Sequence, residues 1–363
     1  MRTLSKKDVE NLIVGATIMG VGGGGDPNTG LKSVLEAVEQ GKKVVLIGVD
    51  ELRPDDLLAS PYYVGSVAPT GRKVERRVGD PMAEAAALLE GTLGKKLRAT
   101  VSSEIGGGNT GACLAISAKL GVPTVDGDLM GRAGPELHQS TANIFGYPMT
   151  PSAIVAEAGN RVVVHAAAGI DEYEAIARHI SVVSGGHAAV VDTPLLGTHA
   201  QKCVVRGTLT QCITIGEARQ KALDSGDDPI QAVASKLRNG KLIFRGRVSA
   251  YNWKDTGGFL VGEVQVDGVG EHTGKKLKTW IKNEHIVCWV EGKPVVLPPD
   301  LIVFLEPATA LGITNDKLSV GQEVVVVGAS VDEVWRSEAG IRLFGPRHFG
   351  FDYEYTPFEN LAH

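Results

Sequence analysis

Along the first half of the chain, hydrophobic positions alternate between helical spacing and short continuous runs. Residues 9–16 show the helical spacing, and Ser5 with Asp8 forms a capping-box-like start just before them. The same patterns predict further helices over residues 31–41, 81–93 and 112–120, and strands over residues 43–49, 62–67 and 97–102. Alternation of helices with strands is typical of an α/β domain.

The second half of the chain changes to short strands separated by glycine turns. The pattern predicts a strand at 159–165, a helix at 170–179, a strand at 188–192, and helices at 215–225 and 229–239. After Leu242 it predicts strands at 243–248, 259–266, 277–281, 286–290, 301–305 and 323–327. The sequence therefore predicts an N-terminal α/β domain with a mainly parallel sheet over residues 1–167. A β-rich α+β domain follows over residues 168–363.

Composition excludes several classes of protein. The 363 residues are 43% hydrophobic and 22% charged, with a net charge of −5, which is ordinary globular usage. The absence of a basic cluster argues against nucleic acid as a partner, and no apolar run reaches the ~20 residues of a membrane span. The N-terminal segment lacks the apolar core of a signal peptide. We expect a cytoplasmic homo-oligomer with reduced thiols.

Candidate chemistry is concentrated in a strand, glycine turn, helix and strand that span residues 97–128. Glu104 stands at the first strand end, and Asp126 and Asp128 stand at the second. Acids at strand ends suit acid–base catalysis or binding of a divalent ion such as zinc. His199, on a predicted glycine-flanked loop, is a candidate metal ligand together with Asp128, and Glu136 or His138 lies close by in the sequence.

Two segments match the pattern GxGxxG. The first, over residues 20–25, follows a helix, so it is either a helix C-terminal turn or a loop that lines the site with Asp26 pointing inward. The second, over residues 106–111, has a strand before it, a helix after it and Asp126 twenty residues beyond Gly106. Those are elements of a dinucleotide fingerprint, although the carboxylates of Glu104 and Asp128 would repel a pyrophosphate.

Structural roles compete with these chemical ones. Asp128 could cap a helix that begins near Leu129 and form an ion pair with Arg132. Cys113 lies in the first turn of a predicted helix, a position that lowers the pKa of a thiol and favours the nucleophilic thiolate. A small buried hydrophobe is the commoner role of such a cysteine. The segment 344–350 around His348 either reaches back to the site or caps the last strand.

Four motifs together resemble the S-methyl thiohydantoin desulfurase family. They are Gly-Gly-Gly-Gly-Asp-Pro at 22–27, Glu-Ile-Gly-Gly-Gly-Asn at 104–109, the segment 125–136 with Asp-Gly-Asp-Leu-Met-Gly-Arg-Ala, and Phe-Gly-Pro-Arg-His-Phe-Gly at 344–350. The resemblance covers essentially the whole chain. It implies a hydrolase in which water replaces the methylthio group of a small hydantoin-like ring, giving a hydantoin and methanethiol.

The hydrolysis that the resemblance implies needs a base or a nucleophile, and the sequence offers both. The carboxylates are preferred, because three acids converge and only one thiol lies near them. Asp126, Asp128 or Glu104 would act as base or metal ligand with His199, and Cys113 is the alternative nucleophile. The remaining candidates would bind the substrate, with the first three as a cradle for a ring carbonyl: Gly107, Gly108, Asn109, Asp26, Arg132 and His348. Two other functions stay open, namely a dinucleotide-binding oxidoreductase and a non-catalytic partner subunit of a hydantoinase-type enzyme.

Overall fold

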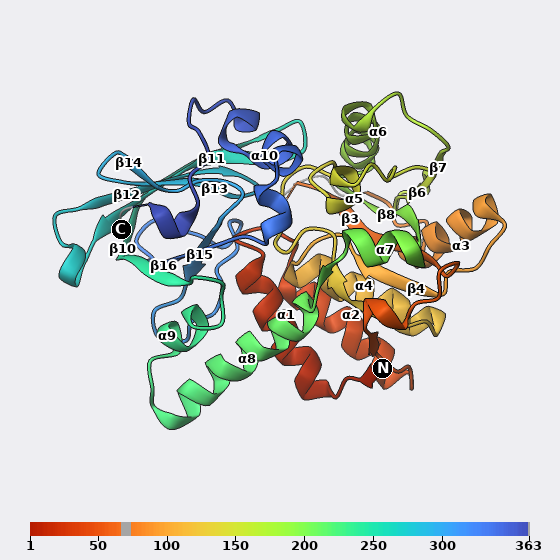
Figure 1. Cartoon of the computed structure of the whole chain (residues 1–363), viewed down its shortest axis with the longest axis horizontal. Helices are drawn as coiled ribbons and strands as arrows, with labels where there is room; N and C mark the ends of the chain where they lie inside the picture. The colour runs from red at the N-terminus through yellow and green to blue at the C-terminus, as the bar shows by residue number, and fades with distance from the viewer. Residues whose placement is uncertain (67–73, 362–363) are drawn as a thin grey trace.

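Two β-sheets of different character organise the chain (Figure 1). The computed structural model describes residues 1–66 and 74–361. The first sheet has the order β1-β2-β5-β4-β3-β8-β6-β7, with β9 paired to β5. Its strands are β1 Arg2–Thr3, β2 Val45–Ile47, β3 Leu57–Gly65, β4 Ala99–Ser102, β5 Thr124–Asp128, β6 Ser152–Val155, β7 Arg161–Val164, β8 His187–Leu196 and β9 Val205–Arg206.

The central strands β2, β5, β4 and β3 run parallel, and the outer strands pair with them antiparallel. The predicted α/β fold with a parallel sheet is therefore confirmed. The sheet continues beyond residue 167, because β8 and β9 belong to it. The division at residues 167 and 168 stays a prediction. Val67, the last residue of one predicted strand, lies outside the described residues.

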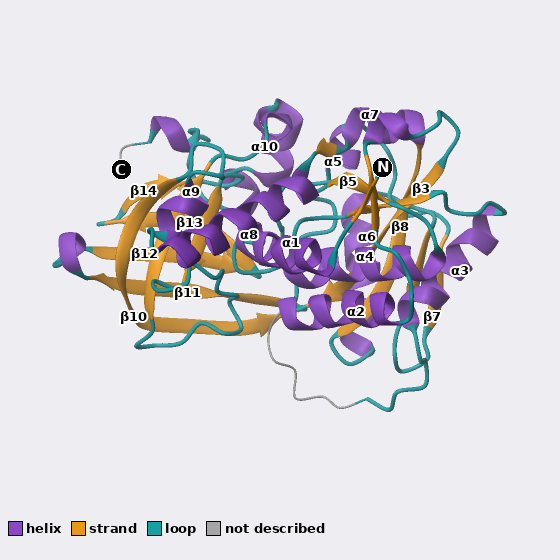
Figure 2. Cartoon of the chain, turned by 90° about the horizontal axis from the view of Figure 1, so that it is seen from below, coloured by secondary structure: helices purple, strands orange, loops and turns teal. Residues whose placement is uncertain are grey.

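Helices cover this sheet and connect it to the second one (Figure 2). They are α1 Lys6–Met19, α2 Pro27–Glu39, α3 Pro81–Leu93, α4 Gly107–Leu120, α5 Thr141–Ile144, α6 Ile170–Val183, α7 Gly197–Cys203, α8 Thr208–Ser225, α9 Pro229–Ala234 and α10 Glu338–Phe344. The capping box predicted for α1 forms, since the Asp8 N–H donates to the Ser5 hydroxyl oxygen at 3.1 Å. No helix among the described residues is long and apolar enough to cross a membrane.

Asp-Pro pairs start three of the helices. Asp26, Asp80 and Asp228 each accept hydrogen bonds from backbone N–H groups of the first turn, and each is followed by a proline at the first helical position. Proline suits that position because its missing N–H has no partner there in any helix. As a helix cap, the Asp26 carboxylate accepts hydrogen bonds from the N–H of Thr29 at 3.1 Å and from its hydroxyl at 2.7 Å.

The second sheet is antiparallel throughout, with the order β14-β13-β12-β11-β10-β16-β15, and it curls in Figure 1. Its strands are β10 Lys241–Thr256, β11 Phe259–Gly268, β12 Lys276–Lys282, β13 Glu284–Val290, β14 Lys293–Val296, β15 Leu301–Leu305 and β16 Glu323–Ala329. All six strands predicted after Leu242 are present, and β14 was not predicted. The β-rich second region is confirmed.

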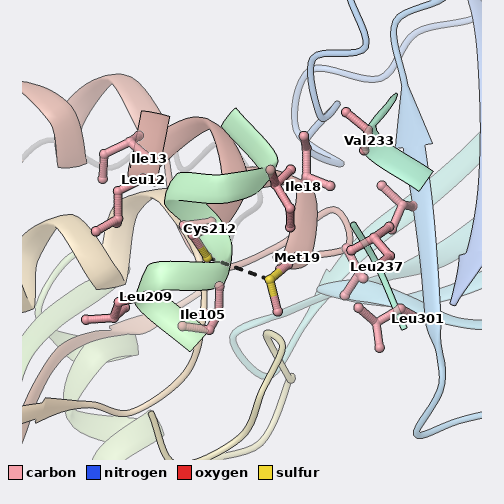
Figure 3. Packing of buried hydrophobic residues seen from close by; sticks show 14 of the residues in the cluster. Leu12, Ile13, Ile18, Met19, Ile105, Leu209, Cys212, Val233, Leu237 and Leu301 are labelled. Atoms are coloured by element: carbon pink, nitrogen blue, oxygen red, sulfur yellow. Dashed lines mark hydrogen bonds between the residues drawn. The ribbon is translucent and has the colours of Figure 1, made fainter. Parts of the chain in front are cut away.

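One hydrophobic cluster joins the two sheets through α1 and α8 (Figure 3). The two helices pack backbone against backbone, since a Cβ on Gly15 would lie 2.0 Å from the Cys212 carbonyl oxygen. The Cys212 sulfur lies 3.6 Å from the Met19 sulfur, and Leu301 of β15 extends the same cluster. The domains therefore share a core, which holds the loop after α1 in a fixed place between them.

Candidate functional site

A cavity of about 430 Å³ lies where the first sheet meets the second. Its wall includes the glycine loop at 22–26, the end of β3 at 62–66, residues 103–104 after β4, the segment 134–137 and the hairpin turn at 283–284. This volume is in the usual range of small-molecule sites. Strand ends and loops from both halves of the chain thus converge on one cavity.

The structure divides the predicted site residues into two groups. Four of them line the cavity, namely Asp26, Glu104, Gly108 and Asn109. The others do not line it, and these are Asp126, Asp128, Cys113, Gly107, Arg132, His199 and His348. The acids of the first strand end and of the second strand end therefore do not share one site.

Glu104 is a partly buried carboxyl group held by two donors. Its Oε1 accepts from the Asn109 side-chain amide at 2.8 Å, and its Oε2 accepts from the Gly134 N–H at 3.0 Å. Asn109 in turn accepts from the Tyr63 N–H at 3.0 Å, which anchors the amide to β3. Burial raises the pKa of Glu104, and the two donors together with the charge of Arg132 oppose that rise.

Glu284 is a second carboxyl group on the same cavity, and its side chain is buried. It begins β13 and follows Asn283, whose φ of 57° makes a tight left-handed turn. Its side chain packs on Gly23, where a Cβ would lie 1.8 Å from Glu284 Oε1. Its Oε2 has no hydrogen-bond partner among the described residues. Burial, and next the negative charge of Glu104, raise the pKa of Glu284 well above its usual value.

Sequence reasoning missed Glu284. A short polar segment between two predicted strands is the usual composition of a hairpin turn, so residues 282–285 gave no reason to expect a buried acid. The nearest indication lay elsewhere, in the run of glycines at 22–25 that leaves room for this side chain.

Another carboxyl group on the cavity wall, buried and also missed, is that of Asp192 in β8. Its Oδ2 accepts from the hydroxyl groups of Tyr62 at 2.7 Å and Tyr173 at 2.8 Å, and its Oδ1 accepts from the Thr193 hydroxyl at 2.9 Å. Burial raises the pKa of Asp192 to about 6. These donors hold Asp192 as part of a polar network behind the wall.

The glycines of the second GxGxxG segment face protein backbone. A Cβ on Gly106 would lie 2.3 Å from the Cα of Gly24, and one on Gly111 would lie 2.5 Å from the Cα of Gly30. The glycines therefore let α4 approach the first glycine loop and α2, which lie beside it in Figure 2. In a dinucleotide-binding motif, the glycines allow a pyrophosphate to approach the backbone closely. Here another segment of the same chain occupies that position.

The predicted carbonyl cradle is also occupied. The N–H groups of Gly108 and Asn109 both donate to the Gly24 carbonyl oxygen, each at 3.0 Å. The Gly108 amide is thus not available for a ring carbonyl, contrary to the prediction. The first glycine loop combines both of its predicted roles, since Gly20 ends α1 and residues 22–26 line the cavity.

The two acids of β5 face the start of α8. Asp126 accepts from the Thr210 N–H at 2.9 Å and from its hydroxyl at 2.6 Å. Asp128 is fully buried, and it accepts from the N–H groups of residues 130–131 at 2.9 and 2.6 Å and from the Thr208 hydroxyl at 2.8 Å. Burial raises the pKa of Asp128 to about 7. No helix begins at Leu129; the next one starts at Thr141.

Arg132 connects the two domains. Its guanidinium is fully buried and donates to the carbonyl oxygens of Pro299 and Asp300 at 2.8 Å each, and to that of His285 at 3.3 Å. Burial lowers the pKa of Arg132 to about 10, and the charges of Glu284, Asp300 and Glu104 oppose that change. The predicted ion pair with Asp128 is replaced by these carbonyl contacts, and the side chain has no surface in the cavity.

Cys113 and His199 lie in surroundings that differ from the predicted ones. Cys113 is buried in α4, and burial raises the pKa of its thiol to about 12, the reverse of the predicted lowering. His199 is part of α7 rather than a loop, and its ring stacks on Tyr147 with 4.4 Å between ring centroids. Among the described residues, neither His199 nor Asp128 belongs to a cluster of side chains that could hold a metal ion, so the structure does not support the predicted metal site at this pair.

The segment around His348 does reach back across the molecule. His348 Nε2 lies 2.5 Å from Oε2 of Glu136, and Glu136 is on the cavity wall. The Lys282 ammonium contacts the other oxygen of Glu136 at 2.5 Å. These partners hold the pKa of Glu136 at about 2 against the effect of its burial.

Two protein-family models match this chain. The model described as S-Me-THD-like, N-terminal domain, matches residues 7–166, and the model described as S-Me-THD-like, C-terminal domain, matches residues 169–358. The chain belongs to this family. The resemblance to the S-methyl thiohydantoin desulfurase family is thereby confirmed.

A solved structure shares the fold of this family member. It is an X-ray crystal structure of a protein from Chromobacterium violaceum, with a TM-score of 0.79 and 22% sequence identity. The match covers 99% of this chain and 100% of that chain. No curated protein sequence matches the chain.

Proposed function

We propose that this protein hydrolyses an S-methylated thiohydantoin or a closely related ring. Water adds to ring carbon C2, the bond from C2 to sulfur breaks, and the products are a hydantoin and methanethiol. Of the two protons of the added water, one ends on the ring nitrogen and the other on the departing thiolate. Family membership supports the substrate class, and the cavity supports the chemistry.

The observation that carries this proposal is that one cavity is lined by the carboxyl groups of Glu104, which is partly buried, and Glu284, which is buried. Hydrolysis of this kind needs a base that takes a proton from water and an acid that protonates the ring nitrogen or the departing sulfur. Two carboxyl groups whose surroundings separate their pKa values can divide these tasks.

The hydrogen bonds assign the two tasks. Glu104 receives two N–H donors, from Asn109 and Gly134, which stabilise its ionised form, so it acts as the base. Glu284 has an Oε2 without a partner among the described residues, and burial together with the negative charge of Glu104 raises its pKa, so it retains the proton and acts as the acid. A protonated Glu284 also avoids the repulsion of two adjacent carboxylates.

The test is turnover of Glu104→Gln and Glu284→Gln on a small panel of hydantoins and S-methyl thiohydantoins. Each amide keeps the size of the side chain but cannot exchange the proton, so we expect kcat to fall by roughly 10²–10⁴-fold in each variant. The matched control is Asp126→Asn, which lies outside the cavity and should retain wild-type turnover.

Full activity in both glutamine variants would refute the roles of the carboxyl groups. An inactive wild-type protein on the whole panel would refute the substrate class. A fall in turnover of Asp126→Asn as large as that of Glu104→Gln would indicate that the active site lies at β5 instead.

A further inference from the structure

A cluster of two histidines and one glutamate lies beside the cavity. Glu136 and His138 belong to the irregular segment between β5 and α5, and His348 belongs to the 3-10 helix Pro346–Phe349 near the other end of the chain. One nitrogen or oxygen atom from each of the three side chains lies within 4.8 Å of the corresponding atoms of the other two. His348 Nε2 is 2.5 Å and His138 Nε2 is 3.6 Å from the same oxygen, Oε2 of Glu136.

The three side chains are withdrawn from solvent. The exposed fraction is 11% for the side chain of Glu136, 5% for that of His138 and 22% for that of His348. Two imidazole nitrogens and one carboxylate oxygen are a ligand set that zinc uses in open sites with three protein ligands. The cluster therefore has both the chemistry and the enclosure of a zinc site.

A second observation concerns the far side of the His138 ring. His138 Nδ1 is buried and has no hydrogen-bond partner among the described residues, yet Asp171 Oδ1 lies only 3.6 Å away. A metal-bound histidine usually donates its other ring N–H to a carboxylate, which orients the ring. Asp171, at the start of α6, is placed to do this once Nε2 binds a cation.

Oε2 of Glu136 is the oxygen that faces both histidines and would bind the cation. The Lys282 ammonium contacts Oε1 at 2.5 Å, on the opposite oxygen from the histidines. The Gln139 side-chain amide donates to Oε2 at 2.7 Å and would have to yield to the ion. A cation would replace the proton that His348 and Glu136 share and release it to solvent.

We propose that Glu136, His138 and His348 bind one divalent transition-metal ion, best represented by zinc, at the wall of the cavity. This differs from the pair His199 and Asp128 that the sequence suggested. It is also independent of the reaction, because the ion can be measured without a substrate. Since Glu136 also lines the cavity, the bound ion would lie next to whatever ligand occupies it.

The experiment measures zinc binding by the intact protein after dialysis against a chelator. Calorimetric titration with zinc chloride should show one site per chain, and elemental analysis after gel filtration should find one zinc. Cobalt should bind in the same place and show the visible absorption of a four-coordinate ion. Glu136→Gln and His348→Gln should each weaken zinc binding by about tenfold or more.

The matched control is His187→Gln, because His187 lines the same cavity outside the cluster. It should bind zinc as the wild type does. Melting curves without metal identify variants that fail to fold, and Glu136→Gln is the gentler variant because an amide oxygen can still accept from Lys282. Failure of the wild type to bind zinc or cobalt would overturn the proposal. Equal binding by wild type, Glu136→Gln and His348→Gln would also overturn it.

Discussion

Replacing Asp128 by asparagine should change how the stability of the protein depends on pH. Asparagine has nearly the same shape, and its oxygen can accept from the N–H groups of residues 130–131 while its amide donates to the Thr208 hydroxyl. The substitution therefore keeps the three hydrogen bonds of Asp128 and removes only its ionisation.

The magnitude follows from the pKa of Asp128, which burial raises from 3.8 to about 7. The folded protein then holds a proton that the unfolded chain has released, so the free energy of unfolding falls as pH rises between these two values. At about 1.4 kcal/mol per unit, the roughly two units between pH 5 and pH 7 amount to about 3 kcal/mol. Above pH 7 the difference stays constant.

The assay is urea unfolding of wild type and Asp128→Asn at pH 5 and pH 8. Between these two values the variant should gain about 3 kcal/mol relative to the wild type. Ser102→Ala is the matched control, because Ser102 pairs with Asp128 across β4 and β5 and carries no titrating group. Its cost should be equal at both pH values. If the difference in free energy of unfolding between Asp128→Asn and wild type were the same at both pH values, the hydrogen bonds to the carboxylate would offset the effect of burial on its pKa.

Four further predictions concern packing and specificity. Gly111→Ala should destabilise the protein by roughly 1–3 kcal/mol in thermal or urea unfolding, because its Cβ would lie 2.5 Å from the Gly30 Cα. Gly91→Ala in α3, with open space around it, should instead stabilise by up to about 1 kcal/mol. Arg132→Met should destabilise by about 3 kcal/mol or more in the same assay, because buried carbonyl groups of the second domain lose their donors. Acidic side chains outnumber the single arginine, Arg178, among the described residues of the cavity wall, so carboxylated ring substituents should raise KM relative to neutral ones.

Local patterns predicted much of the fold because the backbone geometry and the end residues of an element depend mainly on its own sequence. The helix predicted at 81–93 forms with those bounds, since Asp80 caps it and Gly94 ends it in a left-handed conformation. His199 shows the limit of the same reasoning. Gly197, two residues before His199, suggested a loop. In the structure a helix begins at this glycine, and position 197 has no room for a side chain because a Cβ there would lie 2.0 Å from the Arg53 carbonyl oxygen.

The candidate site was predicted in part, for a physical reason. Glu104 and Asn109 follow β4 directly, so the sequence could place them together at a strand end. Asp126 and Asp128 also stand at a strand end, but register alone does not reveal that α8 returns to cover them. Glu284 comes from the other sheet, about 180 residues after Glu104, and only the tertiary contact brings the two into one cavity.

Glu284 also allows a catalytic role to be distinguished from a structural one. Its pKa is raised in the folded protein, so its ionised form opposes folding, and that penalty grows as pH rises above the usual carboxyl value. Glu284→Gln should therefore unfold at a higher temperature than wild type at neutral pH, although it turns over substrate more slowly. A group retained for packing would show the reverse, with loss of stability and unchanged turnover in the fraction that folds. Because the structure places Arg132 near both carboxyl groups, its charge lowers this penalty without removing it, which is how Glu104 and Glu284 can lie on one cavity.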